Sequence, residues 1–168
     1  QIMETSTWDR PMWNMEKILS GEKPKWNYVD GCMLLAFVEL FKHTKDEKYI
    51  TFVQDYIDHY FVQDGLLGYV YDSFNLDNIN TGKVLFFLYQ HTGDAKYLQA
   101  IKLLYKQVEH QPRTKEGNFW HKRIYPNQIW LDGLYMVMPF YAAYETKFNK
   151  LEHYKDIFTQ ITTVRKLM

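Results

Sequence analysis

The sequence contains a single cysteine, Cys32, so no disulfide can form within the chain and a reducing compartment is permitted. No apolar run is long enough to span a membrane, and residues 1–10 are too polar to form a signal peptide. We therefore expect no membrane partner. We expect a cytoplasmic protein, or a periplasmic or secreted one if a signal peptide has been removed.

The chain also lacks an excess of charge of either sign. Lys and Arg number 20, Asp and Glu also number 20, and no basic run stands out, which argues against nucleic acid as a partner. Phosphate-loop, Rossmann and nucleophile-elbow signatures are absent, and no two His or Cys residues have the spacing of metal ligands. We expect neither a metal nor a cofactor.

Aromatic residues, in contrast, are abundant. They make up 18% of the sequence, with 14 Tyr, 11 Phe and 5 Trp. Tyr and Trp combine an apolar body with a polar tip, which suits a sugar-binding cleft as well as a hydrophobic core. With 168 residues the chain is long enough to bury such a core as a single domain.

One pattern occurs three times along the chain. In each copy an acid opens an apolar run, and a Tyr about twenty positions later lies near the start of a one-sided helical pattern. Repetition at roughly 50 residues predicts stacked supersecondary units. The spacings are 19 residues from Asp30 to Tyr49, 20 from Asp77 to Tyr97, and 22 from Asp132 to Tyr154.

Each unit is predicted to contain two kinds of helix. The helix after the acid is apolar nearly all round, as in residues 136–144, and must be covered on more than one side. The helix after the Tyr is amphipathic, and Thr44 and Thr92 are its expected N-caps in the first two units. Inner buried helices alternating with outer amphipathic ones predict an all-α fold of the α/α toroid type. The three acids would then lie at one rim.

Two segments are expected to depart from regular helix. Pro139 lies within the third apolar run, where it should kink the helix or place the regular part of the helix after itself. Residues 119–123 are expected to form a short strand or ribbon beside the rim.

Asp77 and Asp132 are the candidate catalytic pair. They head the inner helices of neighbouring units, so a toroid would bring both carboxylates to the same opening. Two nearby carboxylates repel each other, which raises the pKa of one and provides an acid and a base near neutral pH. Two helix-capping acids are the alternative, and capping is the commoner use of Asp at such positions. Asp30, the third equivalent, is expected to be a cap or a hydrogen-bond partner.

Two further residues lie near these acids in the sequence. His121 is part of an aromatic loop, where it could be a structural hydrogen-bonding residue or take part in catalysis. Trp130 could belong to the core, or its face could stack on a sugar ring.

Three segments carry a family resemblance: Leu-Asp-Asn-Ile-Asn-Thr-Gly at 76–82, Phe-Trp-His-Lys at 119–122, and Gln-Ile-Trp-Leu-Asp-Gly-Leu-Tyr-Met at 128–136, with Pro139 and Phe140 following. Together they resemble the unsaturated rhamnogalacturonyl hydrolases of glycoside hydrolase family 105, which are relatives of the unsaturated glucuronyl hydrolases. The similarity extends from Trp26 past Tyr154.

The resemblance implies an (α/α)6 barrel in which Asp132 is the acid and base and Asp77 positions and tunes it. It implies a substrate pocket that contains His121 and Trp130, with Tyr28, Asn78 and Met136 as further substrate-binding candidates. The implied reaction hydrates the C4=C5 double bond of the unsaturated uronic acid that a polysaccharide lyase leaves on pectin-derived oligosaccharides. An unsaturated glucuronyl hydrolase acting on glycosaminoglycan fragments and a non-catalytic helical-repeat interaction module are the alternatives.

The length of the chain departs from the family pattern. Six hairpins at this spacing would need about 300 residues, so about three fit. Residues 1–168 are therefore predicted to be a single all-α domain that corresponds to the N-terminal half of the barrel. Such a half leaves the inner helices at 33–38 and 136–144 partly uncovered, which should favour self-association or a second chain that completes the ring.

Overall fold

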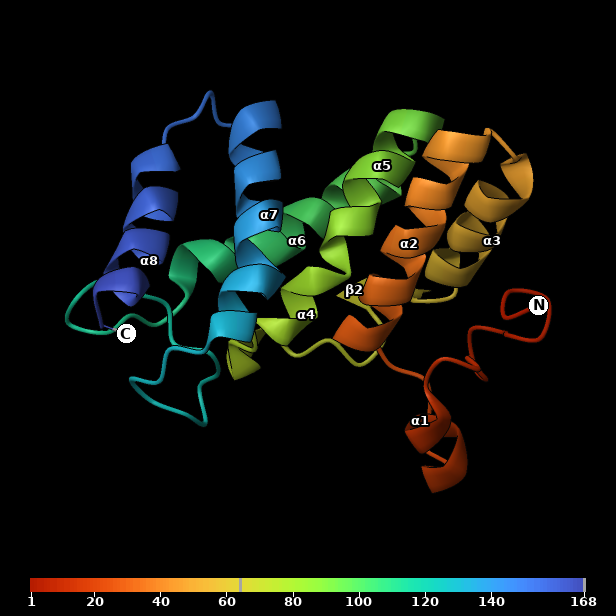
Figure 1. Cartoon of the computed structure of the whole chain (residues 1–168), viewed down its shortest axis with the longest axis horizontal. Coiled ribbons are helices and arrows are strands. Elements are labelled where there is room, and N and C mark those ends of the chain that lie inside the picture. Colours follow the sequence, from red (N-terminus) through yellow and green to blue (C-terminus); the bar gives the residue numbers. More distant parts are fainter. Residues whose placement is uncertain (64, 168) are drawn as a thin grey trace.

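The computed structural model describes residues 1–63 and 65–167, and within them three α/α hairpins stand side by side (Figure 1). Each hairpin pairs an inner helix with an outer one, as the repeat predicts. The inner helices are α2 (Tyr28–Thr44), α4 (Asp77–Asn80) with α5 (Gly82–Thr92), and α7 (Leu131–Lys147). The outer helices are α3 (Glu47–Asp58), α6 (Ala95–His110) and α8 (Tyr154–Leu167).

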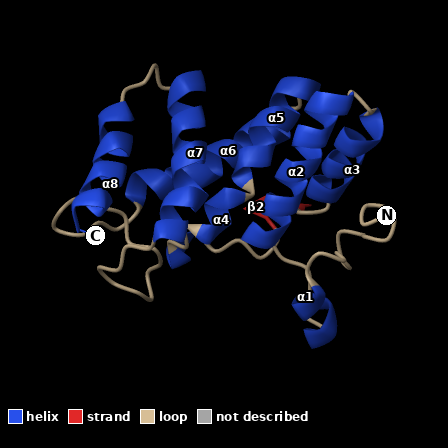
Figure 2. Cartoon of the chain, in the orientation of Figure 1, coloured by secondary structure: helices blue, strands red, loops and turns tan. Residues whose placement is uncertain are grey.

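Little other regular structure is present in the described residues (Figure 2). A short helix, α1 (Met15–Ser20), precedes the first hairpin and was not indicated by the sequence pattern. Strands β1 (Phe61–Val62) and β2 (Gly65–Leu66) form one antiparallel pair, and a 3-10 turn, η1 (Tyr71–Ser73), follows. Among the described helices, none combines the length and apolar character needed to cross a membrane.

The hydrophobic core lies where the inner and outer helices face each other. Leu34, Leu85 and Phe140 from inner helices are fully buried, as are Ile57 and Ile101 from outer ones. Burying a side chain of this size contributes roughly 1.5–3 kcal/mol. The core therefore joins successive hairpins into one body.

The outer helices begin two residues later than expected. Thr44 is the last residue of α2, and its hydroxyl accepts a hydrogen bond from the Asp46 backbone N–H. Asp46 is the N-cap of α3, and Asp94 is that of α6, each accepting from a backbone N–H two residues on. The prediction that Thr44 and Thr92 are N-caps is therefore wrong. Helices α2 and α5 end in a left-handed residue, so the chain needs two more positions before the next helix starts.

Helix α7 continues through Pro139, so the alternative in which its regular part begins after that proline is wrong. Proline has no backbone N–H, which deprives the Tyr135 carbonyl of its usual helical donor. Lys83 Nζ donates to that carbonyl at 2.7 Å and also to Asn80 Oδ1 at 2.7 Å. A side chain from α5 thus replaces the missing backbone hydrogen bond. Burial lowers the pKa of Lys83 to about 8.

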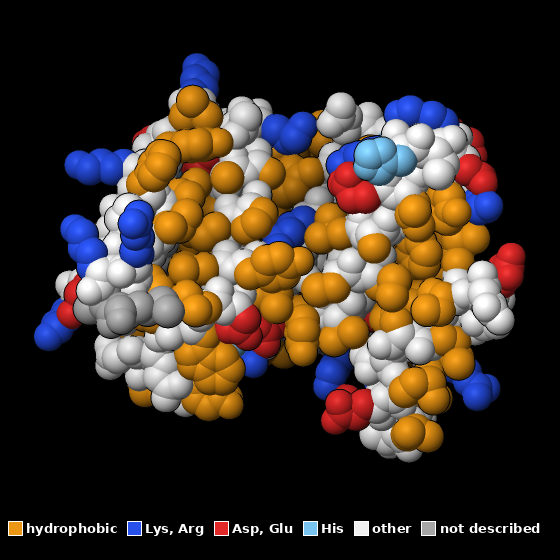
Figure 3. Space-filling view, in the orientation of Figure 1, with side chains coloured by type: hydrophobic (Ala, Val, Ile, Leu, Met, Phe, Trp, Pro, Cys, Tyr) orange, Lys and Arg blue, Asp and Glu red, His pale blue; other side chains and the backbone are white. Residues whose placement is uncertain are grey.

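The inner helices leave an apolar stripe uncovered, which we define as the exposed residues Tyr28, Cys32, Ala36 and Leu40 of α2 and Leu131, Tyr135 and Pro139 of α7. Within each helix these residues are four apart, so they share one face. Figure 3 shows hydrophobic side chains gathered over this side of the molecule. The prediction of an uncovered inner face is correct for the helices. At 33–38 and 136–144 the exposure is partial, as predicted, since Ala36 and Pro139 are exposed whereas most of their neighbours are buried.

Candidate active site

Two carboxylates from neighbouring hairpins converge at one end of the inner helices. Asp77 is the first residue of α4 and Asp132 is in the first turn of α7, where the helix dipole favours negative charge. One oxygen of each carboxylate and one ring nitrogen of His121 all lie within 4.8 Å of one another. The structure therefore brings together the three polar residues that the sequence singled out.

Neither acid caps its helix. In the described residues the N-cap positions of α4 and α7 are Leu76 and Trp130, and neither of these two residues makes a side-chain cap hydrogen bond. The capping alternative for this pair is not supported. The two acids differ in exposure, since Asp77 is 9% exposed whereas Asp132 is open to solvent.

Asp77 is held by a lysine that the sequence analysis did not select. Lys122 Nζ lies 2.7 Å from Asp77 Oδ2, and its ammonium is 5.9 Å from the centre of the Trp130 ring. The other oxygen, Oδ1, is 3.4 Å from His121 Nε2, without the geometry of a hydrogen bond. The only signal for Lys122 in the sequence is its place next to His121, in the segment that carries the family resemblance.

His121 is buried and stacked. Only 1% of it is exposed, and its ring lies 4.2 Å from the Trp130 ring at an interplanar angle of 11°. Burial lowers the pKa of His121, against the opposing attraction of Asp77 and Asp132, so the imidazole is neutral near pH 7. Among the described residues neither ring nitrogen has a hydrogen-bond partner.

A glycine allows the imidazole to approach α7 closely. A Cβ on Gly133 would lie 2.8 Å from His121 Nδ1, closer than real side chains come. The Asp132-Gly133 pair thus combines a carboxylate with the space that the histidine ring needs. This gives a physical reason for glycine at this position in the family segment.

The loop that carries His121 is fixed by backbone hydrogen bonds on both sides. His121 N–H donates to Gln128 O at 2.8 Å, and Leu76 N–H donates to His121 O at 3.1 Å. The second bond ties the loop to the residue before Asp77. Of the short strand or ribbon expected at 119–123, the strand is absent from these residues, and an isolated antiparallel bridge pairs Phe119 with Arg113.

Two buried glutamine amides, from the last turn of α6 and its C-cap, support these loops from behind. Gln111 Nε2 donates to Phe74 O at 2.7 Å and to Trp120 O at 2.8 Å. Gln107 Nε2 donates to Asn75 O at 3.1 Å. The outer helix of the second unit therefore positions the loops on which Asp77 and His121 lie. Sequence reasoning missed these glutamines because their partners are distant in the chain.

Trp130 presents an aromatic surface next to the carboxylates. It is 37% exposed, and its ring stacks on His121 and on Tyr125, with a centroid distance of 5.2 Å to the latter. Its Nε1 donates to Gln128 Oε1 at 3.0 Å. Trp130 is therefore held in place while part of its ring faces solvent.

The other predicted substrate-binding residues are Tyr28, Asn78 and Met136. Tyr28 is 42% exposed at the start of α2, where its carbonyl accepts from Asn80 Nδ2 at 2.9 Å. The carbonyl of Asn78 accepts from Trp26 Nε1 at 2.7 Å, and Met136 is 6% exposed one turn after Asp132. Within the described residues no hydrogen bond joins their side chains to the acid pair, so their roles stay predictions.

Asp30, the first-unit equivalent, is fully buried. Its carboxylate accepts from Trp13 Nε1 at 2.8 Å, from Asn27 Nδ2 at 2.7 Å and from the Tyr60 hydroxyl. Asn27, not Asp30, caps α2. Of the two roles expected for Asp30, the structure supports that of a hydrogen-bond partner.

Two comparisons with known proteins find similarity to glycoside hydrolases. The family model described as Glycosyl Hydrolase Family 88 matches residues 5–168. A solved structure of a family 105 glycoside hydrolase from C. acetobutylicum ATCC 824 is 39% identical, with a TM-score of 0.81. The match covers 92% of this chain but 44% of that one, so this chain spans less than half its length. With the three hairpins, these matches confirm the predicted fold class, an all-α part of an (α/α)6 toroid.

Proposed function

Because the chain belongs to Glycosyl Hydrolase Family 88, we propose that it contributes the acid–base machinery of an unsaturated uronyl hydrolase. The resemblance to the family 105 enzymes, which was expected from the sequence, is thereby confirmed. The proposed substrate is the oligosaccharide that a rhamnogalacturonan lyase leaves, with an unsaturated uronic acid at its end. The observation that carries the proposal is the convergence of Asp77, His121 and Asp132 within 4.8 Å, next to the exposed Trp130.

Asp132 is the proposed proton donor. As a carboxylic acid it protonates C4 of the vinyl ether, and the resulting carboxylate then takes a proton from the water that adds at C5. The product is a hemiketal, which opens and releases the neighbouring sugar. Asp132 suits this role because its side chain is exposed, so an alkene carbon can reach it.

Asp77 is the proposed positioning acid. Lys122 neutralises part of its charge at 2.7 Å, so the repulsion between the two carboxylates is weaker than the sequence alone suggests. The Lys122 contact also fixes the orientation of the Asp77 carboxylate. In this proposal Asp77 does not exchange a proton. It orients both the substrate and the Asp132 side chain.

Trp130 and His121 are the proposed sugar-binding residues. The exposed edge of the Trp130 ring can pack against a sugar ring, and the neutral His121 can exchange hydrogen bonds with a hydroxyl. Both ring nitrogens of His121 lack partners in the described part of the chain, so a sugar hydroxyl would satisfy a buried polar group. Tyr28, Asn78 and Met136 are proposed to line the pocket further along.

The apolar stripe is proposed to be covered by the rest of a ring. Its members on α2 and α7 lie on the inner face, which in a closed toroid would be lined by further hairpins. A second copy of this chain or another chain could supply them. Exposed apolar area of this kind marks an interaction surface.

Activity is best tested in a closed ring. In a chimera, this chain replaces the matching segment of the C. acetobutylicum family 105 enzyme, and turnover is followed as loss of unsaturated-uronate absorbance. We expect turnover of an unsaturated rhamnogalacturonan disaccharide, and less of an unsaturated glycosaminoglycan disaccharide. A reversed preference would favour the glucuronyl alternative. A folded, monodisperse chimera that turns over neither would remove the enzyme proposal and favour a non-catalytic interaction module.

A binding experiment on this chain alone provides a second measurement. Addition of the unsaturated rhamnogalacturonan disaccharide should shift the indole NMR signal of Trp130, which a Trp130→Phe variant identifies. The other four tryptophans are internal controls. If saturating disaccharide leaves all five indole signals in place, Trp130 does not bind the sugar.

A further inference from the structure

Three potential metal ligands meet at the rim of the inner helices. One oxygen each of Asp77 and Asp132 and one nitrogen of His121 lie within 4.8 Å of one another. From this geometry we propose that they form a binding site for a divalent transition-metal ion such as Zn²⁺, which would inhibit rather than assist the enzyme. The inhibition rests on the proposed function, whereas the binding does not.

The distances fit a small ion. For metal–ligand bonds of about 2.0–2.1 Å, two ligand atoms of a tetrahedron lie roughly 3.4 Å apart. Asp77 Oδ1 and His121 Nε2 are separated by 3.4 Å. Asp132 is exposed, so its carboxylate can rotate to complete the third position without disturbing the core.

The second observation is the unpartnered state of the two inner ligands. The His121 side chain is 0% exposed, yet neither of its nitrogens has a hydrogen-bond partner in the described residues, and the same is true of Asp77 Oδ1. A buried polar atom without a partner costs free energy, so such atoms indicate a bound group. Gly133 lies against Nδ1, where a Cβ would come within 2.8 Å, so Nε2 is the nitrogen that faces Asp77 and the cluster.

The ligand types select the class of ion. An imidazole nitrogen with carboxylate oxygens suits Zn²⁺ and similar transition metals better than Mg²⁺ or Ca²⁺, which prefer oxygen ligands. Lys122 occupies Asp77 Oδ2 and leaves Oδ1 available. Its positive charge opposes a second cation, so we expect the site to be weaker than a dedicated zinc site.

The consequence for catalysis follows from Asp132. A carboxylate that coordinates Zn²⁺ cannot carry the proton that C4 must receive, and the ion occupies the space of the sugar. Zn²⁺ should therefore compete with substrate, and a chelator should restore activity.

Isothermal titration of the 168-residue chain with ZnCl₂, without substrate, tests the site directly. The expected result is one ion per chain for the wild type and no binding of Mg²⁺ at the same concentration. Asp132→Asn and His121→Gln should each weaken Zn²⁺ binding at least about tenfold, and Lys122→Met should tighten it by about as much. His43→Gln, an exposed histidine far along α2, is the matched control and should bind as the wild type does.

Circular dichroism on every variant checks that a change in Zn²⁺ binding does not result from loss of the folded structure. The proposal is overturned if the folded wild type does not bind Zn²⁺, or if Asp132→Asn and His121→Gln bind it unchanged. Failure of Lys122→Met to tighten binding would contradict the placement of the ion beside Asp77. Absence of Zn²⁺ binding would leave the hydrolase proposal intact. An inactive protein that binds Zn²⁺ would support the metal site and remove its inhibitory role.

Discussion

The first and third hairpins contain the same dipeptide at the same place and use it differently. Asp30-Gly31 lies in the first turn of α2, and Asp132-Gly133 lies in the first turn of α7. Both glycines permit a close approach, because a Cβ on Gly31 would lie 2.7 Å from Thr81 Cα and one on Gly133 would lie 2.8 Å from His121 Nδ1. In both helix starts the glycine therefore lets another segment pack closely.

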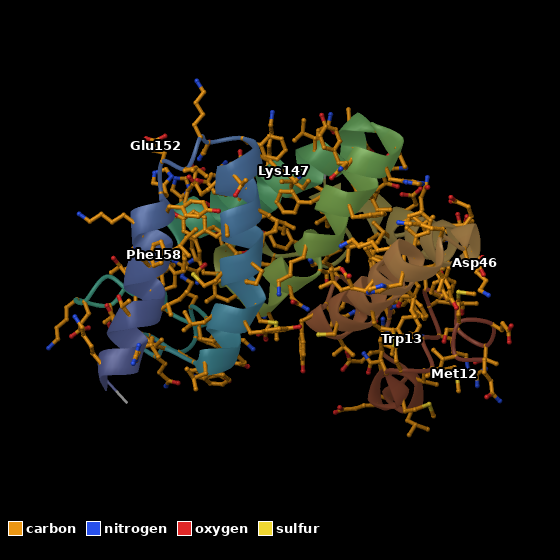
Figure 4. All side chains as sticks on the ribbon, turned by 45° about the horizontal axis from the view of Figure 1, so that its top comes forward. Met12, Trp13, Asp46, Lys147, Glu152 and Phe158 are labelled. Carbon is orange, nitrogen blue, oxygen red and sulfur yellow. The ribbon has the colours of Figure 1, made fainter. Side chains whose placement is uncertain are left out.

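The two acids nevertheless have opposite surroundings. Asp30 is buried under the N-terminal segment, from which Trp13 (labelled in Figure 4) donates to its carboxylate. No segment in the described part of the chain covers Asp132 in the same way. Asp77 is intermediate, since it is nearly buried but paired with the lysine of a loop. The repeat thus sets the position of an acid, and the covering segment sets its role.

The largest expected effect is on activity, at the third hairpin. Asp132→Asn in the chimera should lower kcat by a factor of about 10²–10⁴, because the amide cannot donate the proton. Its stability should change by less than about 0.5 kcal/mol, since the side chain is exposed. Absorbance assays and urea unfolding measure the two quantities. An Asp132→Asn variant that is active but destabilised would show that Asp132 has a structural role and is not the proton donor.

The corresponding change at the first hairpin should act on stability. Asp30→Ala leaves the Trp13 and Tyr60 donors without an acceptor, which should cost about 3 kcal/mol in the free energy of unfolding. Urea unfolding of this chain measures it, with Asp132→Ala as the matched control. Equal stability of the two variants would show that burial does not separate the two acids.

A pH-dependent contribution to stability is expected from Lys83, the lysine that joins the second and third hairpins. The pKa of Lys83 is lowered to about 8 from an ordinary value of 10.5, so the unfolded chain binds more protons between these values. Stability contributed at this site should therefore rise as pH increases from about 8 toward 10.5, and be lower below pH 8.

A Lys83→Met variant lacks this rise, so its stability relative to the wild type should fall across that pH range. Urea unfolding of both proteins at pH 7, 8, 9 and 10 gives the difference, in which the titration of all other groups largely cancels. A difference that does not vary with pH would show that Lys83 is not desolvated.

The smallest expected effect is a difference in stability between variants of Trp13, which contacts Asp30, and Trp130, which precedes Asp132 by two residues. Trp13→Phe removes one hydrogen bond to a buried carboxylate and should cost about 1.5 kcal/mol, less than Asp30→Ala. Trp130→Phe removes an exposed bond to Gln128 and keeps an aromatic ring to stack on His121 and Tyr125, so it should cost less than Trp13→Phe in the free energy of unfolding. Thermal or urea unfolding of the pair provides the comparison. If both cost the same, the N-terminal segment does not stabilise Asp30 through this bond.

The periodicity of the sequence was sufficient to predict the hairpins. Apolar runs and one-sided helical patterns are local, so the inner and outer helices could be placed from neighbouring residues. The same repeat placed Asp77 and Asp132 at one rim, and the structure brings them together with His121. Local rules failed at the turns, where left-handed residues displaced the caps from Thr44 and Thr92.

Sequence alone therefore determined the order of the inner and outer elements of the three hairpins and the positions of the acids at the starts of the inner ones. The tertiary structure decided what each acid touches. The contacts that matter join residues far apart in the chain: Trp13 with Asp30, Lys122 with Asp77, and Lys83 with the carbonyl left free by Pro139. Such contacts depend on how whole hairpins pack, because burial and charge pairing are properties of the assembled core and not of any single segment.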